Sequence, residues 1–337
     1  MTDPTTLHAW MPTRRTRPRN QPSGILRPMR LPSLGRRRDS AAGRPPAPFV
    51  VGANRSGTTL LRMMLDAHPE LTIPPETHFV PDVIEACEAR GTSPEQLLEV
   101  MTSHREWGDF NLDAGEVLER LQAADELTAG EALRAFYGLY AERVGKPRWG
   151  EKTPGYATSM VQIQGALPEA HFLHLIRDGR DVALSAMDRA KKPITAGQVA
   201  KRWKRRITKA RRHSRKVNYQ EARYEDLVLD TEPSLRRICE FIDLPWDPTM
   251  LDYHQRASER LEEMARELPA QGNRPQLEQD HRLKIHALTT EPPKRERVER
   301  WREQMSEEDR VAFEQIAGDL LDELGYATGQ PVGAVGS

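Results

Sequence analysis

Short apolar runs alternate with longer amphipathic segments along this chain. Residues 49–51 form an apolar run of the kind buried in a parallel sheet, a second strand pattern covers 171–176, and a third strand runs into Tyr224. Between these runs, apolar residues recur at three- and four-residue spacings, which is typical of helices that bury one face. The alternation predicts a three-layer α/β/α fold with a central parallel sheet.

The first apolar run leads directly into a loop of small residues and then into a helix. The run ends at Gly52, the loop spans 53–57, and apolar residues between Leu60 and Leu65 share one helix face. Such a helix begins with unpaired N–H groups and the positive end of its dipole, and several hydroxyl groups surround this point. The segment therefore suits a phosphate or sulfate group.

The two glycines of this loop have the spacing of a phosphate-binding P-loop. The residue after Gly57 is Thr58, however, where nucleotide triphosphatases have a lysine that reaches the outer phosphates. With Arg55 inside the loop, this difference indicates a nucleotide that is bound by its 5′ side and whose γ-phosphate does not react. The alternative is an ordinary strand-to-helix turn that is rich in hydroxyl groups.

Helical patterns fill residues 93–145, which we interpret as an insertion into the α/β domain. Ser93 with Gln96, and Thr128 with Glu131, have the spacing of capped helix N-termini. We expect the insertion to cover one face of the sheet and to line one side of the pocket of an acceptor substrate.

Residues 1–46 differ in composition from the rest of the chain. They contain ten arginines, frequent proline, serine and glycine, and only two acidic residues. Such a segment cannot bury enough apolar surface to offset its chain entropy, so we predict a disordered tail that contacts an anionic partner. Its prolines oppose the amphipathic helix of an organelle transit peptide. One domain is predicted over 47–327, followed by a flexible C-terminus at 328–337.

The composition of the whole chain argues against several classes of protein. The 50 basic and 50 acidic residues balance, so no net field favours nucleic acid or a membrane surface. No apolar run approaches the roughly 18 residues of a spanning helix, so no membrane span is predicted. Cys87 and Cys239 lie far apart and the histidines lack ligand spacing, which predicts a reduced, cytoplasmic protein without a metal site.

Charged residues follow the second predicted strand. Arg177 comes first, and Asp181, Ser185 and Arg189 follow at four-residue intervals, which places these three on one face of the next helix. Ligands of parallel α/β sheets collect beyond the carboxyl ends of the strands. A phosphate bound by the forked guanidinium of Arg177 would therefore also lie within reach of Ser185 and Arg189.

Two further segments carry candidate chemistry. A proline pair fixes the approach to Glu76, a carboxylate that can accept a proton. The nearby His78 fits a second base or an acceptor contact, but such a histidine is more often structural, and no role is assigned to it. The polar loop 148–154 holds Lys152 between a glycine and a proline. The alternative for this lysine is a surface position or an ion pair with Glu151.

A long helix predicted at 195–217 carries lysine and arginine on nearly every face outside a narrow apolar stripe. The simpler interpretation is a solvated basic helix. The alternative is a docking face for an anionic acceptor.

Together, these motifs resemble the sulfotransferases that use 3′-phosphoadenosine 5′-phosphosulfate (PAPS). The resemblance extends over most of residues 48–326 and is carried by the runs VGANRSGTTLLRMMLDAHPEL, PPETHF, GEKTP, LIRDGRDVALS and YEDLV. It is closest to the branch that contains the tyrosylprotein sulfotransferases and many bacterial sulfotransferases. The resemblance implies a P-loop-type fold, PAPS as co-substrate, no metal, and transfer of a sulfuryl group to a hydroxyl of a small-molecule, glycan or peptide acceptor.

The resemblance also implies roles for individual residues. Glu76 would act as general base, and Lys152 and Arg55 would assist the transferring group. The residues implied in PAPS binding are Arg55, Ser56, Gly57, Thr58, Thr59, Arg177, Ser185, Arg189 and Tyr224. The loop that covers the nucleotide in this branch has only an indistinct counterpart at 292–301, so no residue of it is assigned. The animal members carry a membrane anchor, and none is predicted here.

Two other functions stay open at this stage. A P-loop kinase for a small metabolite would use the same strand, loop and helix, but the lysine and a Mg²⁺-binding aspartate after a strand are not evident. A nucleic-acid-binding protein would use the basic tail and the helix at 195–217, which the balanced net charge disfavours. The sequence does not identify the acceptor, and it leaves a homodimer open.

Overall fold

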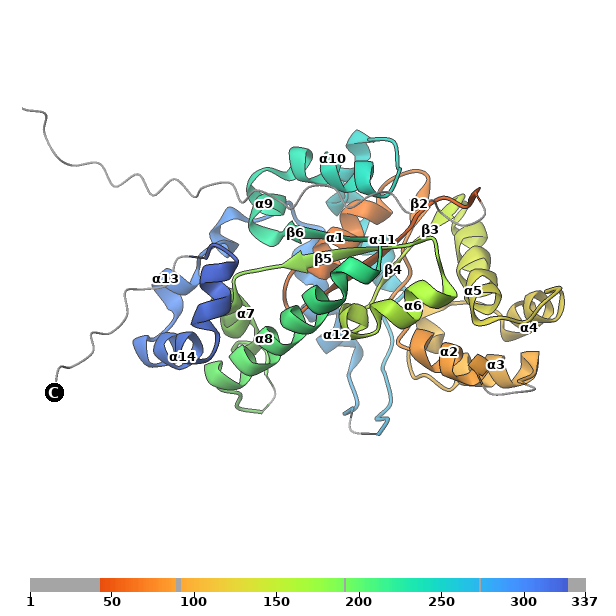
Figure 1. Ribbon diagram of the computed structural model, residues 1–337, viewed down its shortest axis with the longest axis horizontal. Coiled ribbons are helices and arrows are strands. Elements are labelled where there is room, and N and C mark those ends of the chain that lie inside the picture. Colours follow the sequence, from red (N-terminus) through yellow and green to blue (C-terminus); the bar gives the residue numbers. More distant parts are fainter. Residues whose placement is uncertain (1–42, 89–91, 191, 273, 327–337) are drawn as a thin grey trace, which may run out of the picture. The chain divides into compact units, whose positions relative to one another are not determined.

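A computed structural model describes residues 43–88, 92–190, 192–272 and 274–326 (Figure 1). The disordered tail predicted for 1–46 lies almost entirely outside these residues. The flexible C-terminus predicted for 328–337 lies wholly outside them.

Four parallel strands form the central sheet in the order β4-β1-β5-β6. They are β1 (Ala47–Gly52), β4 (Glu151–Lys152), β5 (Ala170–Ile176) and β6 (Tyr219–Arg223), and a separate parallel pair joins β2 (Leu71–Thr72) to β3 (Arg148–Trp149). Strand β1 pairs with β4 on one side and with β5 on the other, so the strand order reverses beside β1. Ligands of α/β sheets bind at such a switch point, beyond the carboxyl ends of the strands.

Helices flank this sheet, which confirms the predicted α/β fold (Figure 1). The α-helices are α1 (Thr58–Asp66), α2 (Val80–Glu88), α3 (Pro94–Thr102), α4 (Ala114–Gln122), α5 (Ala129–Val144), α6 (Met160–Ala166), α7 (Gly179–Met187), α8 (Ala196–His213), α9 (Tyr224–Leu229), α10 (Thr231–Phe241), α11 (His254–Glu262), α12 (Gln279–His286), α13 (Trp301–Gln304) and α14 (Glu307–Glu323). The 3₁₀ helices are η2 (Trp107–Phe110), η3 (Pro154–Thr158), η4 (Ser214–Lys216), η5 (Pro248–Met250), η6 (Ala287–Thr290) and η7 (Arg295–Arg297).

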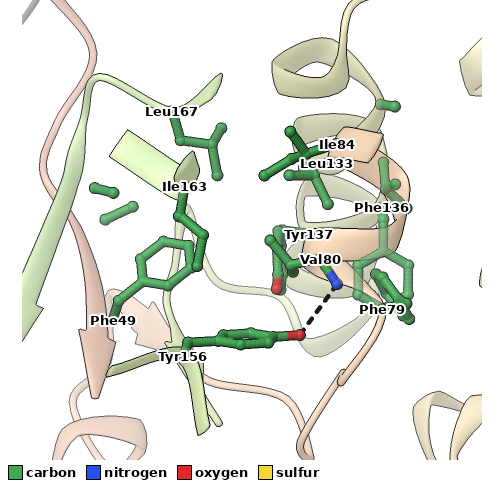
Figure 2. Close-up of a cluster of buried hydrophobic side chains, with 14 of the residues drawn as sticks. Phe49, Phe79, Val80, Ile84, Leu133, Phe136, Tyr137, Tyr156, Ile163 and Leu167 are labelled. Carbon is green, nitrogen blue, oxygen red and sulfur yellow. Dashed lines mark hydrogen bonds between the residues drawn. The ribbon is translucent and has the colours of Figure 1, made fainter. Parts of the chain in front are cut away.

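Alternate residues of β1 face the two sides of the sheet. Phe49 and Val51 pack in a buried cluster with residues of α2 to α6, which Figure 2 shows around Tyr137 and Tyr156. Val50 packs on the opposite side, with apolar residues of α1 and of α9 to α11. The helices within 93–145 therefore belong to the layer on the Phe49 side of the sheet.

The helix starts predicted inside this layer are observed. Ser93 caps α3 in a reciprocal capping box with Gln96, and the hydroxyl of Thr128 accepts a hydrogen bond from the backbone N–H of Glu131 in α5. These signals were readable because a cap needs only residues three positions apart.

Two regions differ from the pattern-based expectation. The predicted polar loop 148–154 contains β3 and β4, because parallel partners far away in the chain supply their hydrogen bonds. The long basic helix ends at His213, and Ser214 begins a 3₁₀ turn. Neither a two-residue strand nor a change of helix type leaves a periodic signal in the sequence.

Candidate functional site

The loop between β1 and α1 presents a helix start that suits an anion. Helix α1 begins at Thr58, its N-cap Gly57 supplies no side-chain hydrogen bond, and its first turn contains no acidic residue. The first N–H groups of α1 therefore remain for a ligand. Ser56 is buried beneath the loop, and its hydroxyl has no hydrogen-bond partner within the described part of the chain.

The backbone of this loop is left-handed at two positions, Arg55 (φ 73°) and Gly57 (φ 93°). Such a conformation is costly for arginine and is typical of strained binding loops. A Cβ atom at residue 57 would overlap the ring of Tyr224, which begins α9. Glycine is therefore needed here both for the conformation and for the close approach of the tyrosine.

One cavity joins this loop to the end of β5. Its lining includes Arg55, residues 57–60, Arg177 after β5, Ser185 on α7 and Tyr224. The cavity contains about 760 Å³ of space including its open mouth. Nε of Arg55 donates a hydrogen bond to Oγ of Ser185 across 3.3 Å. The two anion-binding places expected from the sequence thus face the same space.

Arg177 connects three parts of the cavity wall. Its Nη1 donates to the carbonyl oxygen of Arg55 (3.3 Å), and its Nη2 donates to the carbonyl oxygen of Arg297 (2.7 Å). The guanidinium also lies 4.2 Å from the ring centre of Tyr224. Its buried Nε has no hydrogen-bond partner among the described residues, which leaves one N–H for a ligand.

Positive charge is concentrated around the cavity. Burial and the guanidinium groups of Arg189, Arg177 and Arg297 lower the pKa of Arg55 to about 10. Burial and Arg297 likewise lower the pKa of Arg189. These shifts show that the arginines repel one another, and an anionic ligand would relieve the repulsion.

Arg189 departs from its expected position. Helix α7 ends at Met187 with Asp188 as its C-cap, so Arg189 lies beyond the helix that carries Ser185. It does not line the cavity, although its charge acts on Arg55. Four-residue spacing predicts a shared face only where the helix continues.

A segment near the C-terminus lines one side of the cavity, and we call residues 288–297 the cover segment. Its lining residues are Leu288, Thr289, Pro292, Pro293, Lys294 and Arg297. None of them was predicted from the sequence to be a site residue. The paired prolines and alternating charges of this stretch do not reveal that it returns to the P-loop.

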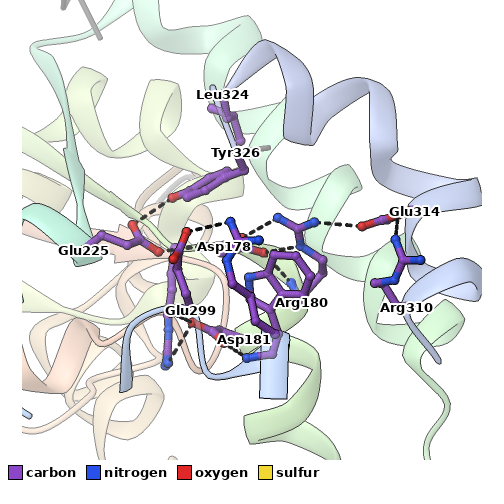
Figure 3. Close-up of polar contacts among 12 residues, drawn as sticks. Asp178, Arg180, Asp181, Glu225, Glu299, Arg310, Glu314, Leu324 and Tyr326 are labelled. Carbon is purple, nitrogen blue, oxygen red and sulfur yellow. Dashed lines mark hydrogen bonds and ion pairs between the residues drawn. The ribbon is translucent and has the colours of Figure 1, made fainter. Parts of the chain in front are cut away.

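Asp181 anchors to α7 the backbone that directly follows the cover segment. Its carboxyl is fully buried and accepts hydrogen bonds from the backbone N–H groups of Glu299 (3.0 Å) and Trp301 (2.9 Å). Figure 3 shows Asp181 beside Glu299 and Asp178. Burial raises the pKa of Asp181 to about 6, although Arg177 opposes the shift. The residue therefore has a structural task that its spacing did not reveal.

Glu76 and Lys152 meet next to this cavity. Nζ of Lys152 lies 2.6 Å from Oε1 of Glu76, and Nε2 of His78 lies 3.3 Å from the other oxygen. Burial opposes ionisation of Glu76, but Lys152 and His78 outweigh it and hold the pKa of this carboxyl well below its usual range. The charge of Glu76 in turn acts on Arg55, so the pair and the P-loop are neighbours.

The two members of this pair differ in exposure. The side chain of Lys152 is 3% exposed, whereas that of Glu76 is 31% exposed. An ionised carboxylate with an accessible edge can accept a proton, and a buried ammonium group can stabilise negative charge nearby.

Several basic side chains of α8 form contacts within the folded chain. Lys204 contacts Asp319 (2.7 Å), and Arg211 contacts Glu221 (2.8 Å). Nη1 of Arg206 donates to the amide oxygen of Asn54 (2.8 Å) in the P-loop. These contacts favour a structural interpretation of the helix.

Two features are absent from the part of the chain that the structure describes. There, no three histidine, cysteine, aspartate or glutamate side chains come together as a potential metal site. No described helix combines the length and apolar character needed to span a bilayer.

Known proteins resemble this chain in sequence. The model of the sulfotransferase family matches residues 46–248. Protein-tyrosine sulfotransferase A of Caenorhabditis elegans is 32% identical over 220 residues, which cover 61% of this chain and 52% of the relative. Protein-tyrosine sulfotransferase 1 of Homo sapiens is 28% identical over 222 residues, which cover 62% and 54%. The chain spans about half the length of the curated relatives it matches.

Solved structures share the fold. The sulfotransferase domain from the curacin biosynthetic pathway has a TM-score of 0.53 at 20% identity and covers 82% of this chain and 98% of that chain. The sulfotransferase domain of the Synechococcus PCC 7002 olefin synthase has a TM-score of 0.52 at 21% identity. The family match spans more than half of the chain and contains the P-loop, Glu76, Lys152 and Arg177. The chain therefore belongs to the sulfotransferase family.

Proposed function

We propose that this protein transfers a sulfuryl group from PAPS to a hydroxyl group of an acceptor. The observation that carries the proposal is the single cavity shared by the P-loop, Arg177 and Ser185. PAPS has two anionic ends, a phosphosulfate on the 5′ side of its ribose and a phosphate on the 3′ side. The cavity offers one anion-binding place for each.

The residues around the cavity suit this donor. The start of α1 and the hydroxyls of Thr58 and Thr59 bind the 5′-phosphosulfate. Arg177 and Ser185 bind the 3′-phosphate, and Tyr224 lies against the nucleotide. Unpartnered buried atoms, Nε of Arg177 and Oγ of Ser56, support this assignment because such groups are costly unless a ligand satisfies them.

In the proposed reaction, Glu76 takes the proton of the acceptor hydroxyl. The acceptor oxygen then forms a bond to sulfur while the bond from sulfur to the bridging phosphate oxygen breaks, and that oxygen keeps the electron pair. The products are the sulfated acceptor and 3′-phosphoadenosine 5′-phosphate (PAP). A positioned general base typically contributes about 10²–10⁴-fold to such a rate.

Lys152 and Arg55 supply positive charge for the leaving phosphate. Contacts position both groups, since Lys152 is buried on β4 and Arg55 donates a hydrogen bond to Ser185. Fixed charges of this kind stabilise a transition state without reorganising during the reaction.

The acceptor class is a separate part of the proposal. The relatives are named as protein-tyrosine sulfotransferases, so a peptide tyrosine is the first acceptor to test. A hydroxyl of a glycan or of a small molecule is the alternative. A metabolite kinase is disfavoured because Thr58 stands where a P-loop lysine would reach the γ-phosphate.

The first prediction concerns Glu76→Gln. We expect this variant to lower kcat by about 10²–10⁴-fold, because the amide cannot take the acceptor proton. Its affinity for PAP, measured by calorimetry, is expected to change by less than about threefold, because the nucleotide cavity is lined by other residues. Glu85→Gln on the exposed side of α2 is the control and is expected to leave both quantities unchanged.

Two outcomes would contradict the proposal. Full turnover by Glu76→Gln would remove the base assignment. Tighter binding of ATP than of PAP, with Mg²⁺-dependent phosphoryl transfer, would favour a kinase.

A further inference from the structure

Glu151 carries a buried carboxyl group that has no part in the proposed reaction. It precedes Lys152 on β4, and its side chain is fully buried. Successive strand residues point to opposite faces of a sheet. The ion pair between Glu151 and Lys152 that sequence left as an alternative is therefore not the contact observed, since Lys152 pairs with Glu76.

Three hydroxyl groups donate hydrogen bonds to this carboxyl. Oε2 accepts from Tyr137 on α5 (2.7 Å) and from Thr77 in the loop before α2 (3.2 Å). Oε1 accepts from Thr153 (2.5 Å). Burial raises the pKa of Glu151 to about 7, and the three hydroxyls limit the rise. The carboxyl thus ties together the helical layer, the loop and the edge strand.

Tyr156 extends the hydrogen-bond network on the side of the loop that contains Thr77. The hydroxyls of Thr77 and Tyr156 lie 2.9 Å apart, and the Tyr156 oxygen accepts a hydrogen bond from the backbone N–H of Val80 (3.1 Å; Figure 2). Tyr137 and Tyr156 are both buried in the aromatic cluster of this layer. Close packing of the two rings keeps their hydroxyls in place.

The loop and the strand therefore touch through two adjacent pairs. Glu76 contacts Lys152 beside the cavity, and Thr77 contacts Glu151 in the core. The next loop residue, His78, has a left-handed backbone with φ 59°. Such a conformation persists in a non-glycine residue only when the surroundings hold it. The contact between Thr77 and Glu151, which we call the core pair, helps to hold this conformation.

We propose that Glu151 is a positioning residue for sulfuryl transfer. Through Thr77 it holds the loop in the conformation that presents Glu76 to Lys152. This inference rests on the proposed function, because it concerns the placement of the proposed base. The nucleotide cavity is lined by other elements, so loss of the core pair affects the chemical step and not donor binding.

The test compares two replacements of Thr77. Thr77→Val removes the hydroxyl at nearly constant volume and is expected to lower kcat about 10–100-fold, because small misplacements of reacting groups are costly. The KM for PAPS and the dissociation constant of PAP are expected to stay within about twofold. Thr77→Ser keeps the hydroxyl and is expected to restore most of kcat.

A second variant links the effect to the carboxyl. Glu151→Gln is expected to lower kcat in the same way. In the double variant with Thr77→Val, kcat is expected to be only slightly lower than in the more impaired of the two single variants. Residues that act through one contact are not additive. A fully additive loss would contradict the inference.

The control is another buried carboxylate. Glu169 is 2% exposed and pairs with Arg134 at 2.6 Å, away from the loop. Glu169→Gln is expected to lower the melting temperature and to leave kcat unchanged. The inference is overturned if Thr77→Val lowers only the melting temperature, or if it weakens PAP binding as much as it lowers kcat.

A crystal structure of Thr77→Val separates this inference from the proposed function. If the wild-type protein transfers no sulfuryl group, the proposed function fails, and the distance between Glu76 and Lys152 in the variant decides the inference. A separated pair supports the positioning role of the core contact. A pair that stays in the wild-type position overturns it.

Discussion

At residue scale, Gly57 combines two requirements in one position. Its φ of 93° suits glycine, and its missing side chain admits the ring of Tyr224 against the P-loop. We predict that Gly57→Ala weakens PAP binding at least tenfold in calorimetry, because the Cβ atom would displace the ring from the cavity wall. The left-handed backbone adds a loss of about 1 kcal/mol in the free energy of unfolding.

Gly145 offers a matched control for this prediction. It ends α5 with φ 74°, and a Cβ atom there would meet nothing within 4 Å. Gly145→Ala is expected to lose similar stability but to bind PAP like the wild-type protein. Equal PAP affinity in the two variants would show that the contact with Tyr224 has no effect on binding.

Glu225 predicts a pH dependence of stability. Its buried carboxyl accepts hydrogen bonds from the N–H of Asp178 (2.9 Å) and the hydroxyl of Tyr326 (2.9 Å; Figure 3), and burial raises its pKa from 4.5 to about 7. Between these values the folded protein keeps a proton that the unfolded chain has lost. The contribution of this carboxyl to stability is therefore complete below pH 4.5 and is lost as pH rises towards 7.

The amide group of Glu225→Gln does not titrate in this pH range. Comparison of this variant with the wild type therefore isolates the pH-dependent contribution of Glu225 to stability. We expect the difference in free energy of unfolding, wild type minus Glu225→Gln, to decrease by about 1–3 kcal/mol from pH 5 to pH 8. Urea denaturation of both proteins at each pH measures this difference. Other buried carboxyls, such as Asp181, titrate in both proteins and cancel in the difference. Parallel stability curves for the two proteins would contradict the assigned pKa.

At the scale of elements, the cover segment depends on α7. Asp181 holds the backbone of Glu299 and Trp301. We predict that Asp181→Asn loosens this segment, since the amide can accept only through one oxygen and turns its N–H₂ group towards a donor. PAP affinity is expected to fall about tenfold, and trypsin is expected to cleave faster near Lys294.

Asp188→Asn is the comparison for this experiment. Asp188 lies at the end of α7, is 53% exposed and contacts Arg300 at 2.6 Å. Exposed ion pairs contribute little, so PAP affinity and the rate of cleavage are expected to stay at wild-type values. If both variants behave alike, the backbone contacts of Asp181 do not control the cover segment.

Elements were predictable where their signals are local. The P-loop, the strand before Arg177 and the caps at Ser93 and Thr128 each depend on residues within one short stretch. Strand β4 was missed because its two residues are extended only through pairing with β1. Arg189 was misplaced because nothing in its spacing shows where α7 ends.

At the scale of the whole molecule, the start of the domain can be tested. Arg44 pairs with Glu131, and Arg148 donates to the carbonyl oxygen of Pro46 (2.8 Å), so contacts with the body begin in this stretch. We predict that deletion of residues 1–42 leaves the melting temperature and PAP affinity unchanged. The deleted stretch contains nine arginines, so retention on heparin is expected to weaken.

The intact protein at the same salt concentration is the reference for this deletion. A lower melting temperature would show that the tail packs on the domain. Retention on heparin that does not change would assign the affinity for polyanions to other basic surfaces, such as α8. The domain boundaries, the cytoplasmic location and the oligomeric state stay predictions.

The sequence by itself determined the class of fold and the position of the P-loop, because apolar periodicity and the spacing of two glycines are signals that neighbouring residues carry. Only the tertiary structure decided that Arg177 and the P-loop share one cavity, that residues of 288–297 line it, and that Glu151 contacts Thr77 beside Glu76. These contacts join segments that lie roughly 75 to 240 residues apart. Packing of the whole chain sets such distances, and no local spacing records them.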